Sequence, residues 1–338
     1  MIKDIEKQAA PVPLLSIKKL KTYYPIKRGI LSKTVGYIKA VDGVDLEIYQ
    51  GETLGLVGES GCGKSSMGRT IVRLENPTEG SIVFNNEDIA GYSNKRMSSI
   101  RTDLQMIFQD PYSSLNPKKR VYDILAEPLK VHKIVPEDKI SEEIDKLLDE
   151  VELPKNFKNR YPNQFSGGQR QRVGIARALA LRPKLIVCDE PVSALDVSTQ
   201  AQVLNLLKDL QKRLNLTYLF IAHGLGAVKY ISDRIAVMYL GKIVELASTD
   251  EIFKNPRHPY TKALLSAYPV PNPHMRNKER VILEGDVPSP ANPPQGCRFH
   301  TRCKFAKKNL CDKDIPELKQ VEGADGKHLS ACFFQDSF

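Results

Sequence analysis

Gly58-Glu59-Ser60-Gly61-Cys62-Gly63-Lys64-Ser65 directly follows the apolar run Thr53-Leu54-Gly55-Leu56-Val57. The spacing Gly-x-x-x-x-Gly-Lys-Ser after a buried strand is typical of a loop whose backbone N–H groups surround a polyphosphate. In such a loop the lysine reaches the β- and γ-phosphates, and the serine hydroxyl ligates Mg²⁺. A helix beginning near Gly63 would add its positive end. A glycine-rich surface turn is the alternative, and it does not account for the complete spacing at the end of a strand. We therefore expect a nucleotide site that includes Gly58, Ser60, Gly61, Cys62, Gly63, Lys64, Ser65 and Ser66.

The composition is that of a soluble globular protein. Charged residues make up 27% of the 338 residues and hydrophobic residues 41%, which excludes a disordered chain. No apolar run approaches the roughly 18 residues needed to cross a bilayer. The first seven residues contain acids and no apolar core of the signal-peptide kind, so we expect the chain to stay in the cytoplasm. There, the six cysteines are better interpreted as thiols or ligands than as disulfides.

The formal charge of +10 is partly concentrated between Lys18 and Lys39, where seven basic residues occur without an acid. Such an excess fits nucleic acid, an anionic membrane surface or solubility alone. Tyr23, Tyr24 and Tyr37 lie in this stretch, so a nucleic-acid surface stays open, although no recognisable nucleic-acid module accompanies it. A solvated basic hairpin near a negatively charged leaflet is the favoured interpretation.

Strands and helices alternate along most of the chain, as a parallel sheet requires. We predict an α/β fold with a parallel-sheet core, an antiparallel edge subdomain and a helical insert, followed by a small cysteine-containing module. The predicted strands are 14–24, 38–49, 52–57, 184–189 and 216–222, with a helix at 197–215 and a hairpin at 234–247. Apolar residues recur at helical spacing within 120–153, which indicates the insert.

The chain divides into three predicted parts. A nucleotide-binding domain covers residues 1–250, with a helical subdomain at about 112–180. Prolines crowd the region after Thr249, so 251–290 is predicted to be a linker, and 291–338 a module with four cysteines.

A second motif decides which nucleotide chemistry to expect. The run Leu185-Ile186-Val187-Cys188-Asp189-Glu190 is a strand that ends in two adjacent carboxylates. Their directions differ, which suits Asp189 to Mg²⁺ and Glu190 to a hydrolytic water. A solvated acidic pair is the plainer alternative.

A third motif, Phe165-Ser166-Gly167-Gly168-Gln169, precedes an alanine-rich helix former. Ser166 as an ordinary helix cap describes the same local geometry. The whole run resembles the signature of ATP-binding-cassette (ABC) ATPases, and the other motifs of that family follow in the expected order. The resemblance implies that Ser166, Gly167, Gly168 and Gln169 bind ATP held by a second cassette, because cassettes of this family pair head to tail.

Further residues are assigned through the resemblance alone. Tyr24 matches the aromatic that stacks on adenine, although it and Tyr23 could equally be packed strand residues. Gln109 matches the glutamine that senses the metal and couples to the transmembrane partner. Asp196, in Ser193-Ala194-Leu195-Asp196, matches the loop that crosses the dimer interface, and His223 matches the switch histidine at the γ-phosphate. The resemblance thus implies Glu190, His223 and Gln109 as catalytic residues, and Ser65, Gln109 and Asp189 around Mg²⁺.

Two positions depart from the common family pattern. Phe165 stands where leucine is frequent, which exchanges one apolar side chain for another. Gly224 stands where aspartate often follows the histidine, which leaves open how firmly His223 is held.

Two longer stretches narrow the resemblance. Residues 108–117 and Arg257-His258-Pro259-Tyr260-Thr261 resemble the ATP-binding subunits of oligopeptide and dipeptide importers, over nearly the whole chain. The basic insert 27–39 resembles the second type of subunit in that subfamily. The resemblance implies a sister ATPase subunit, two transmembrane permease subunits, an extracellular peptide-binding protein, and a location at the cytoplasmic face of the membrane. Related importers move nickel or glutathione, and a soluble cassette ATPase acting on nucleic acid or ribosomes is the competing class, which usually has two cassettes or a long coiled coil.

Four of the six cysteines lie within 36 residues near the C-terminus: Cys297, Cys303, Cys311 and Cys332. The paired Cys-x-x-Cys spacing that favours zinc is absent. Spacing alone leaves a metal site and buried thiols equally open. Four thiolates suit a [4Fe–4S] cluster, and the tail resembles the cluster-binding ends described for peptide importers, which implies such a cluster beside ATP and Mg²⁺.

Overall fold

A computed structural model describes residues 12–30, 32–267, 283, 285–324 and 326–335. The larger of its two described sheets has the strand order β11-β12-β10-β9-β3-β8-β7-β6. The five strands from β9 to β6 are parallel, and β10, β12 and β11 extend them antiparallel. The bounds are β3 Thr53–Val57, β6 Leu104–Ile107, β7 Leu185–Asp189, β8 Thr217–Ile221, β9 Arg234–Tyr239, β10 Lys242–Ser248, β11 Lys319–Gln320 and β12 Leu329–Ser330.

Every residue of β3, β7 and β8 is buried. Central parallel strands are covered on both faces, which is why these segments are continuous apolar runs rather than alternating ones. The carboxyl ends of β3 and β7 lead into the loop 58–63 and into Glu190, so the sheet brings two of the predicted motifs to one edge.

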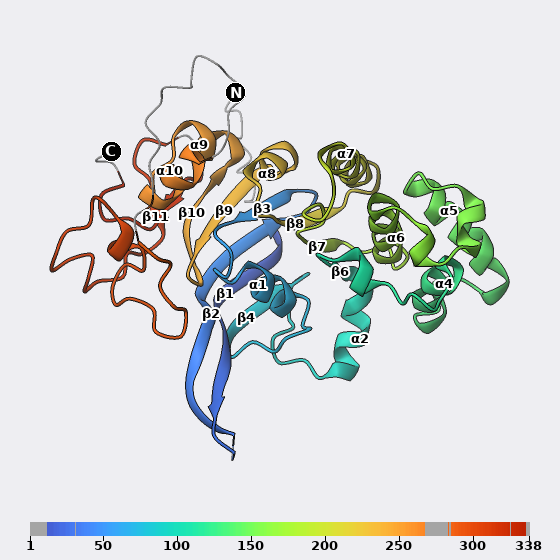
Figure 1. Cartoon of the computed structure of the whole chain (residues 1–338), viewed down its shortest axis with the longest axis horizontal. Helices are drawn as coiled ribbons and strands as arrows, with labels where there is room; N and C mark the ends of the chain where they lie inside the picture. The colour runs from blue at the N-terminus through green and yellow to red at the C-terminus, as the bar shows by residue number, and fades with distance from the viewer. Residues whose placement is uncertain (1–11, 31, 268–282, 284, 325, 336–338) are drawn as a thin grey trace, which may run out of the picture.

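The smaller sheet is antiparallel, in the order β2-β1-β4-β5. Its strands are β1 Pro13–Arg28, β2 Lys33–Tyr49, β4 Glu79–Phe84 and β5 Glu87–Asp88. β1 and β2 are longer than the predicted 14–24 and 38–49, because they continue pairing through the basic stretch and project from the body as a hairpin (Figure 1). Helix α1 (Lys64–Ile71) lies between the two sheets, and an apolar core that includes Met67 and Ile71 fills that space.

The predicted helical insert at 120–153 contains two helices, α4 (Val121–Val131) and α5 (Ile140–Glu150). The chain turns at Lys133, whose φ is 50°, before Pro136 and a short 3₁₀ turn, η1 (Glu137–Lys139). With α3 (Pro111–Ser114), η2 (Lys155–Asn159), η3 (Pro162–Gln164) and α6 (Gly167–Leu179), they form the helical lobe drawn at the right of Figure 1. Three further helices of the cassette are α2 (Asn94–Asp103), α7 (Val197–Leu214) and α8 (Leu225–Ile231).

The first part of the predicted proline-rich linker is helical, with α9 (Thr249–Lys254) and α10 (Pro259–Ser266), and Tyr260 of α10 is fully buried. Residues 268–282 and 284 of that linker lie outside the described part of the chain. The division at 250 and 290 stays a prediction, but the C-terminal segment lies against the cassette, since β12 pairs with β10.

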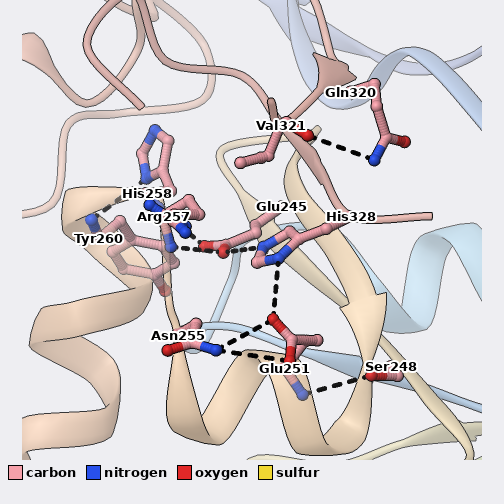
Figure 2. A network of polar contacts seen from close by, with 10 residues as sticks. All are labelled: Glu245, Ser248, Glu251, Asn255, Arg257, His258, Tyr260, Gln320, Val321 and His328. Carbon is pink, nitrogen blue, oxygen red and sulfur yellow. Dashed lines mark hydrogen bonds and ion pairs between the residues drawn. The ribbon is translucent and has the colours of Figure 1, made fainter. Parts of the chain in front are cut away.

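A buried polar network joins the C-terminal segment to the cassette (Figure 2). Glu245 of β10 accepts hydrogen bonds from the backbone N–H of Arg257 (2.6 Å) and His258 (2.9 Å), and its Oε1 lies 2.7 Å from His328 Nε2. Neither Glu245 nor His328 has any solvent exposure. Because a buried carboxylate is stable only when it is paired, this network ties residue 328 to the sheet.

Candidate nucleotide-binding site

The loop between β3 and α1 has the conformation that the glycine spacing predicts. Gly61 and Gly63 have φ angles of 75° and 109°, which side chains other than glycine rarely adopt. A Cβ on Gly58 would lie 2.1 Å from the carbonyl oxygen of Met238, and one on Gly63 would lie 1.9 Å from that of Ala40. The backbone of the loop is thus closely enclosed by the strands around it.

Lys64 and Ser65 lie at the start of α1, directed toward the ends of β7 and β8. The Lys64 ammonium is nearly buried and donates to the carbonyl oxygens of Gly58 (2.8 Å) and Glu59 (3.0 Å). Its Nζ also lies 3.5 Å from His223 Nδ1. Ser65 Oγ donates to Asp189 Oδ1 at 2.8 Å. A hydroxyl and a carboxylate held together in this way are hard oxygen ligands of the kind Mg²⁺ prefers.

Cys62 does not present a reactive thiol in this loop. Its side chain is 4% exposed, and burial raises its pKa, so the sulfur packs as a small apolar group. Any contribution of Cys62 to phosphate binding is therefore through the backbone.

The three residues predicted to be catalytic lie together. Glu190 follows β7, is 4% exposed and has a φ of 49°. Gln109 Nε2 donates to its Oε2 at 2.7 Å, and His223 Nε2 lies 2.6 Å from its Oε1. Both carboxylate oxygens are thus held by side chains from other strand ends. A carboxylate fixed beside a phosphate loop is positioned to accept a proton from water.

The signature segment caps α6. Ser166 Oγ accepts from the Gln169 N–H (3.3 Å), and Gln169 Oε1 accepts from the Ser166 N–H (3.1 Å), which is a capping box. A Cβ on Gly168 would lie 2.3 Å from Thr199 Cγ2, so α6 and α7 approach closely there. Among the described residues, no hydrogen bond or ion pair links 166–169 to the phosphate loop.

Asp196 is the exposed N-cap of α7. It accepts from Ser198 Oγ (2.6 Å), the Thr199 N–H (3.0 Å) and Thr199 Oγ1 (2.7 Å). These bonds, that from Ser198 first, lower the pKa of Asp196. The carboxylate is thus ionised and oriented at a surface.

The two tyrosines near residue 24 have different partners. Tyr23 Oη donates to Asp42, whereas Tyr24 Oη donates to Glu75 and its ring is only partly buried. Burial, followed by the hydrogen bond to Asp42, raises the pKa of Tyr23. Stacking of Tyr24 on adenine stays a prediction.

The two departures from the family pattern have local explanations. Phe165 is buried and packs edge-on against Phe157, with ring centroids 5.3 Å apart. Gly224 begins α8 with ordinary φ and ψ angles and open space around its Cβ position. His223 is held instead by Glu190 and Lys64, so an aspartate at 224 is not required to fix it.

The four C-terminal cysteines line one small cavity, together with Phe299, Phe305 and Phe334 among other residues. None of them forms a disulfide. Burial raises the pKa of Cys297 and of Cys332 to about 11. Among the residues with described positions, no group of three or more His, Cys, Asp or Glu side chains is arranged to hold a metal ion. The four cysteines line one cavity, but the predicted cysteine module and its metal centre are not confirmed.

Two arginines connect this cysteine group with the nucleotide-binding part. Arg298 donates to Asp42 and to the carbonyl oxygen of Leu240, and Arg302 forms a two-point ion pair with Glu59. Sequence reasoning missed both arginines, since neither belongs to a motif.

No described helix is both long and apolar enough to span a membrane.

Comparison with known proteins extends these observations over the whole chain. Residues 41–193 match the family described as ABC transporter, and residues 244–311 match the oligopeptide/dipeptide transporter C-terminal region. The oligopeptide transport ATP-binding protein AppF of Bacillus subtilis (strain 168) is 53% identical over 321 residues, covering 94% of this chain and 96% of that protein. OppF of Salmonella typhimurium, which has the same description, is 52% identical over 327 residues and 96% of each chain.

Solved structures show the same fold at lower identity. A dimeric post-hydrolysis state of the ATP-binding cassette MJ0796, bound to ADP and Pi, is 30% identical and matches with a TM-score of 0.62. It covers 70% of this chain and 98% of that one. Residues beyond the matched 70% have no counterpart in it.

Proposed function

The chain belongs to the ABC transporter family, and from that membership we propose that it is the ATP-hydrolysing subunit of an oligopeptide or dipeptide importer. One observation carries the enzymatic part: Lys64, Ser65 and Asp189 converge on the same point as Glu190 with its two partners. The peptide specificity rests on the likeness to AppF and OppF over almost the full length.

Different residues of this chain have different roles in ATP hydrolysis. The loop 58–65 binds the phosphates, and Ser65 and Asp189 would hold Mg²⁺, which would supply positive charge to offset that of the phosphates. Glu190 takes the proton of the attacking water. Gln109 and His223 keep the Glu190 carboxylate in place, and most of the rate comes from such positioning and charge neutralisation.

A second cassette completes the site. Ser166, Gly167, Gly168 and Gln169 lie at the start of α6, and Asp196 is exposed at the start of α7, so we propose that these residues contact the ATP of the second cassette. The dimer reported for the related cassette MJ0796, bound to ADP and Pi, supports the pairing of two cassettes. We propose a sister ATPase subunit as the natural partner, each chain contributing a signature to the other's ATP.

The permease is proposed to dock in a groove beside Gln109. The groove has a volume of about 560 Å³ and lies between the helical lobe and the core, with Phe108, Ile124, Pro128 and Arg177 in its lining. Because Phe108 directly precedes Gln109, a helix seated there would move the glutamine that holds Glu190. The lining has Arg101, Lys119, His132 and Arg177 against one acid, Glu127, so an apolar segment with an acidic residue is the expected occupant.

We also propose that the chain lies peripherally at the cytoplasmic face of the membrane, under two permease subunits. An extracellular peptide-binding protein would deliver peptides to these permease subunits. Peptides are favoured over nickel or glutathione because the C-terminal region also matches the peptide-transporter family. Tyr24 is proposed to stack on adenine.

A [4Fe–4S] cluster in the C-terminal module belongs to the proposal too. The four thiols share one cavity with no disulfide between them and match the donor set of such a cluster in number and chemistry, but their arrangement in this structure is not that of a metal site. Cys297, Cys303, Cys311 and Cys332 would hold it. Bound there, a cluster would cross-link the segments 297–311 and 332. Absorption near 400 nm in anaerobically purified protein supports it, and colourless protein with stoichiometric zinc refutes it.

Isolation from solubilised membranes tests the function. We expect a permease pair and a second cassette to co-purify, and the reconstituted assembly to hydrolyse ATP faster with a peptide-loaded binding protein. Lys64→Ala is the control, expected to assemble without hydrolysis. Stimulation by nickel or glutathione instead of peptide would contradict the proposed substrate, and the absence of any membrane partner would contradict the transport role.

A further inference from the structure

The C-terminal segment reaches the phosphate loop directly. The short helix η5 (His300–Arg302) lies between Cys297 and Cys303, two of the residues that line the cysteine cavity. From it, Arg302 Nη1 donates to Glu59 Oε2 at 2.8 Å, and Nη2 donates to Oε1 at 3.2 Å. Such a two-point pair constrains both orientation and distance. Glu59 is the second residue of the loop 58–65.

Every polar group of Glu59 is engaged. Its N–H donates to Tyr260 Oη (2.8 Å), its carbonyl oxygen accepts from Lys64 Nζ, and its carboxylate receives Arg302. Two of these partners, Tyr260 and Arg302, lie beyond the residues 41–193 that match the ABC transporter family. The segment after residue 250 therefore helps to position the carbonyl that contacts the phosphate-binding lysine.

The ion pair is well shielded from solvent. The Arg302 side chain is 6% exposed and that of Glu59 is 25% exposed. Tyr239, Tyr260 and Phe299 pack together beside it, with ring centroids 4.7 to 5.4 Å apart. Phe299 also lines the cysteine cavity, so one side chain packs against both the thiols and the aromatic pair beside the arginine. In this setting the pair is screened less than a surface ion pair would be.

The ion pair also changes the charge of the phosphate loop. Glu59 adds a negative charge to a loop that must accept a polyphosphate, and Arg302 neutralises it. Without the guanidinium, the carboxylate would repel the phosphates and its loop would lose one of its fixed points.

We propose that the segment 297–303 is a clamp on the phosphate loop, in which Arg302 is a positioning residue for ATP and the cysteine module thereby sets nucleotide affinity. This clamp rests on the proposed nucleotide site, but not on the identity of the transported substrate. It requires only that the cysteines hold η5 in place, whatever they bind.

Titration of the full chain with a fluorescent ATP analogue tests the clamp. We expect Arg302→Gln to weaken binding about tenfold, and Arg302→Lys, which keeps the charge but loses the fork, to weaken it less. Lys319→Gln is the matched control, because Lys319 of β11 pairs with Glu317 at the surface, with exposed fractions of 70% and 76%.

The double variant separates the effect of an unpaired Glu59 carboxylate from damage to the fold. With Glu59→Gln added to Arg302→Gln, no unpaired carboxylate remains, so the affinity should recover by several-fold. A merely structural loss would leave the double variant as weak as the single one or weaker. In the assembled transporter, Arg302→Gln should raise the KM for ATP with little change in kcat.

Cys303→Ser tests the connection to the cysteine module. Introduced alone, Cys303→Ser should weaken ATP binding. Added to Arg302→Gln, it should have little further effect. Equal affinity of Arg302→Gln and the unaltered chain, or an additive effect of Cys303→Ser, would overturn the clamp. Failure of the unaltered chain to bind ATP would instead overturn the nucleotide site.

Discussion

Replacement of Glu190 by glutamine separates ATP binding from ATP hydrolysis. The carboxylate accepts from Gln109 through one oxygen and faces His223 Nε2 through the other. A glutamine can satisfy both neighbours, because the Gln109 amide can turn over to present its oxygen to the new N–H group while His223 Nε2–H donates to the remaining oxygen. We therefore expect the free energy of unfolding to change by less than about 1 kcal/mol and the Kd for ATP by less than about twofold.

The chemical step should respond very differently. An amide cannot accept the proton of the attacking water, and a positioned general base typically contributes a factor of about 10² to 10⁴. We expect kcat to fall about 10³-fold, which corresponds to about 4 kcal/mol of activation free energy. Because the bound ATP is then cleaved slowly, the ATP-bound pair of cassettes should persist longer than with Glu190.

The assay combines phosphate release by the reconstituted transporter with ATP-analogue binding by the same preparation. Glu142→Gln is the control, since Glu142 lies on the helical lobe with its side chain 57% exposed. Undiminished hydrolysis in Glu190→Gln would remove Glu190 from the role of base. A tenfold loss of ATP affinity would show that its charge serves binding, which contradicts the reasoning from its two partners.

Three further predictions concern the structure around the site. Glu245→Gln should lower the free energy of unfolding by about 2–4 kcal/mol in urea titrations, because one amide N–H must then face a backbone N–H and His328 loses a carboxylate; an unchanged midpoint would contradict this. Burial lowers the pKa of His258 from 6.5 to about 4, so the unfolded chain binds more protons in this interval and the folded chain should lose up to about 3 kcal/mol as the pH falls from 6.5 to 4. His258→Asn, which keeps an acceptor for the start of α10, should flatten that part of the melting-temperature profile, and an equally steep profile would show that other groups cause it. Gly58→Ala should abolish ATP-analogue binding in a chain that keeps its circular dichroism, since its Cβ would meet the Met238 carbonyl at 2.1 Å; normal binding would mean that the loop can move away.

The nucleotide motifs were predictable because each is a short run with its own backbone chemistry. Gly58–Ser65, Ser166–Gln169 and Asp189–Glu190 lie at the ends of buried strands or at helix starts, where the local sequence itself specifies the turn or cap. The alternation of apolar runs and helical patterns likewise predicted the parallel core, since strands covered on both faces have a distinctive composition. The ABC family assignment that followed from these motifs is confirmed by the comparisons.

Contacts between distant segments were not predictable in the same way. The partners in the pairs Arg302–Glu59 and His328–Glu245 are 243 and 83 positions apart in the sequence. No sequence pattern around these four residues indicates which residue each of them contacts. The lengths of β1 and β2 were also not predictable from their apolar residues alone. Pairing between the two strands continues through the basic stretch, beyond the predicted ends at residues 24 and 38. The sequence by itself determined the fold class and the reaction chemistry, because those follow from local periodicity and from residue types at set spacings. Only the tertiary structure decided which carboxylates are paired and how the C-terminal cysteines lie against the phosphate loop, because burial and charge pairing arise when remote segments pack together.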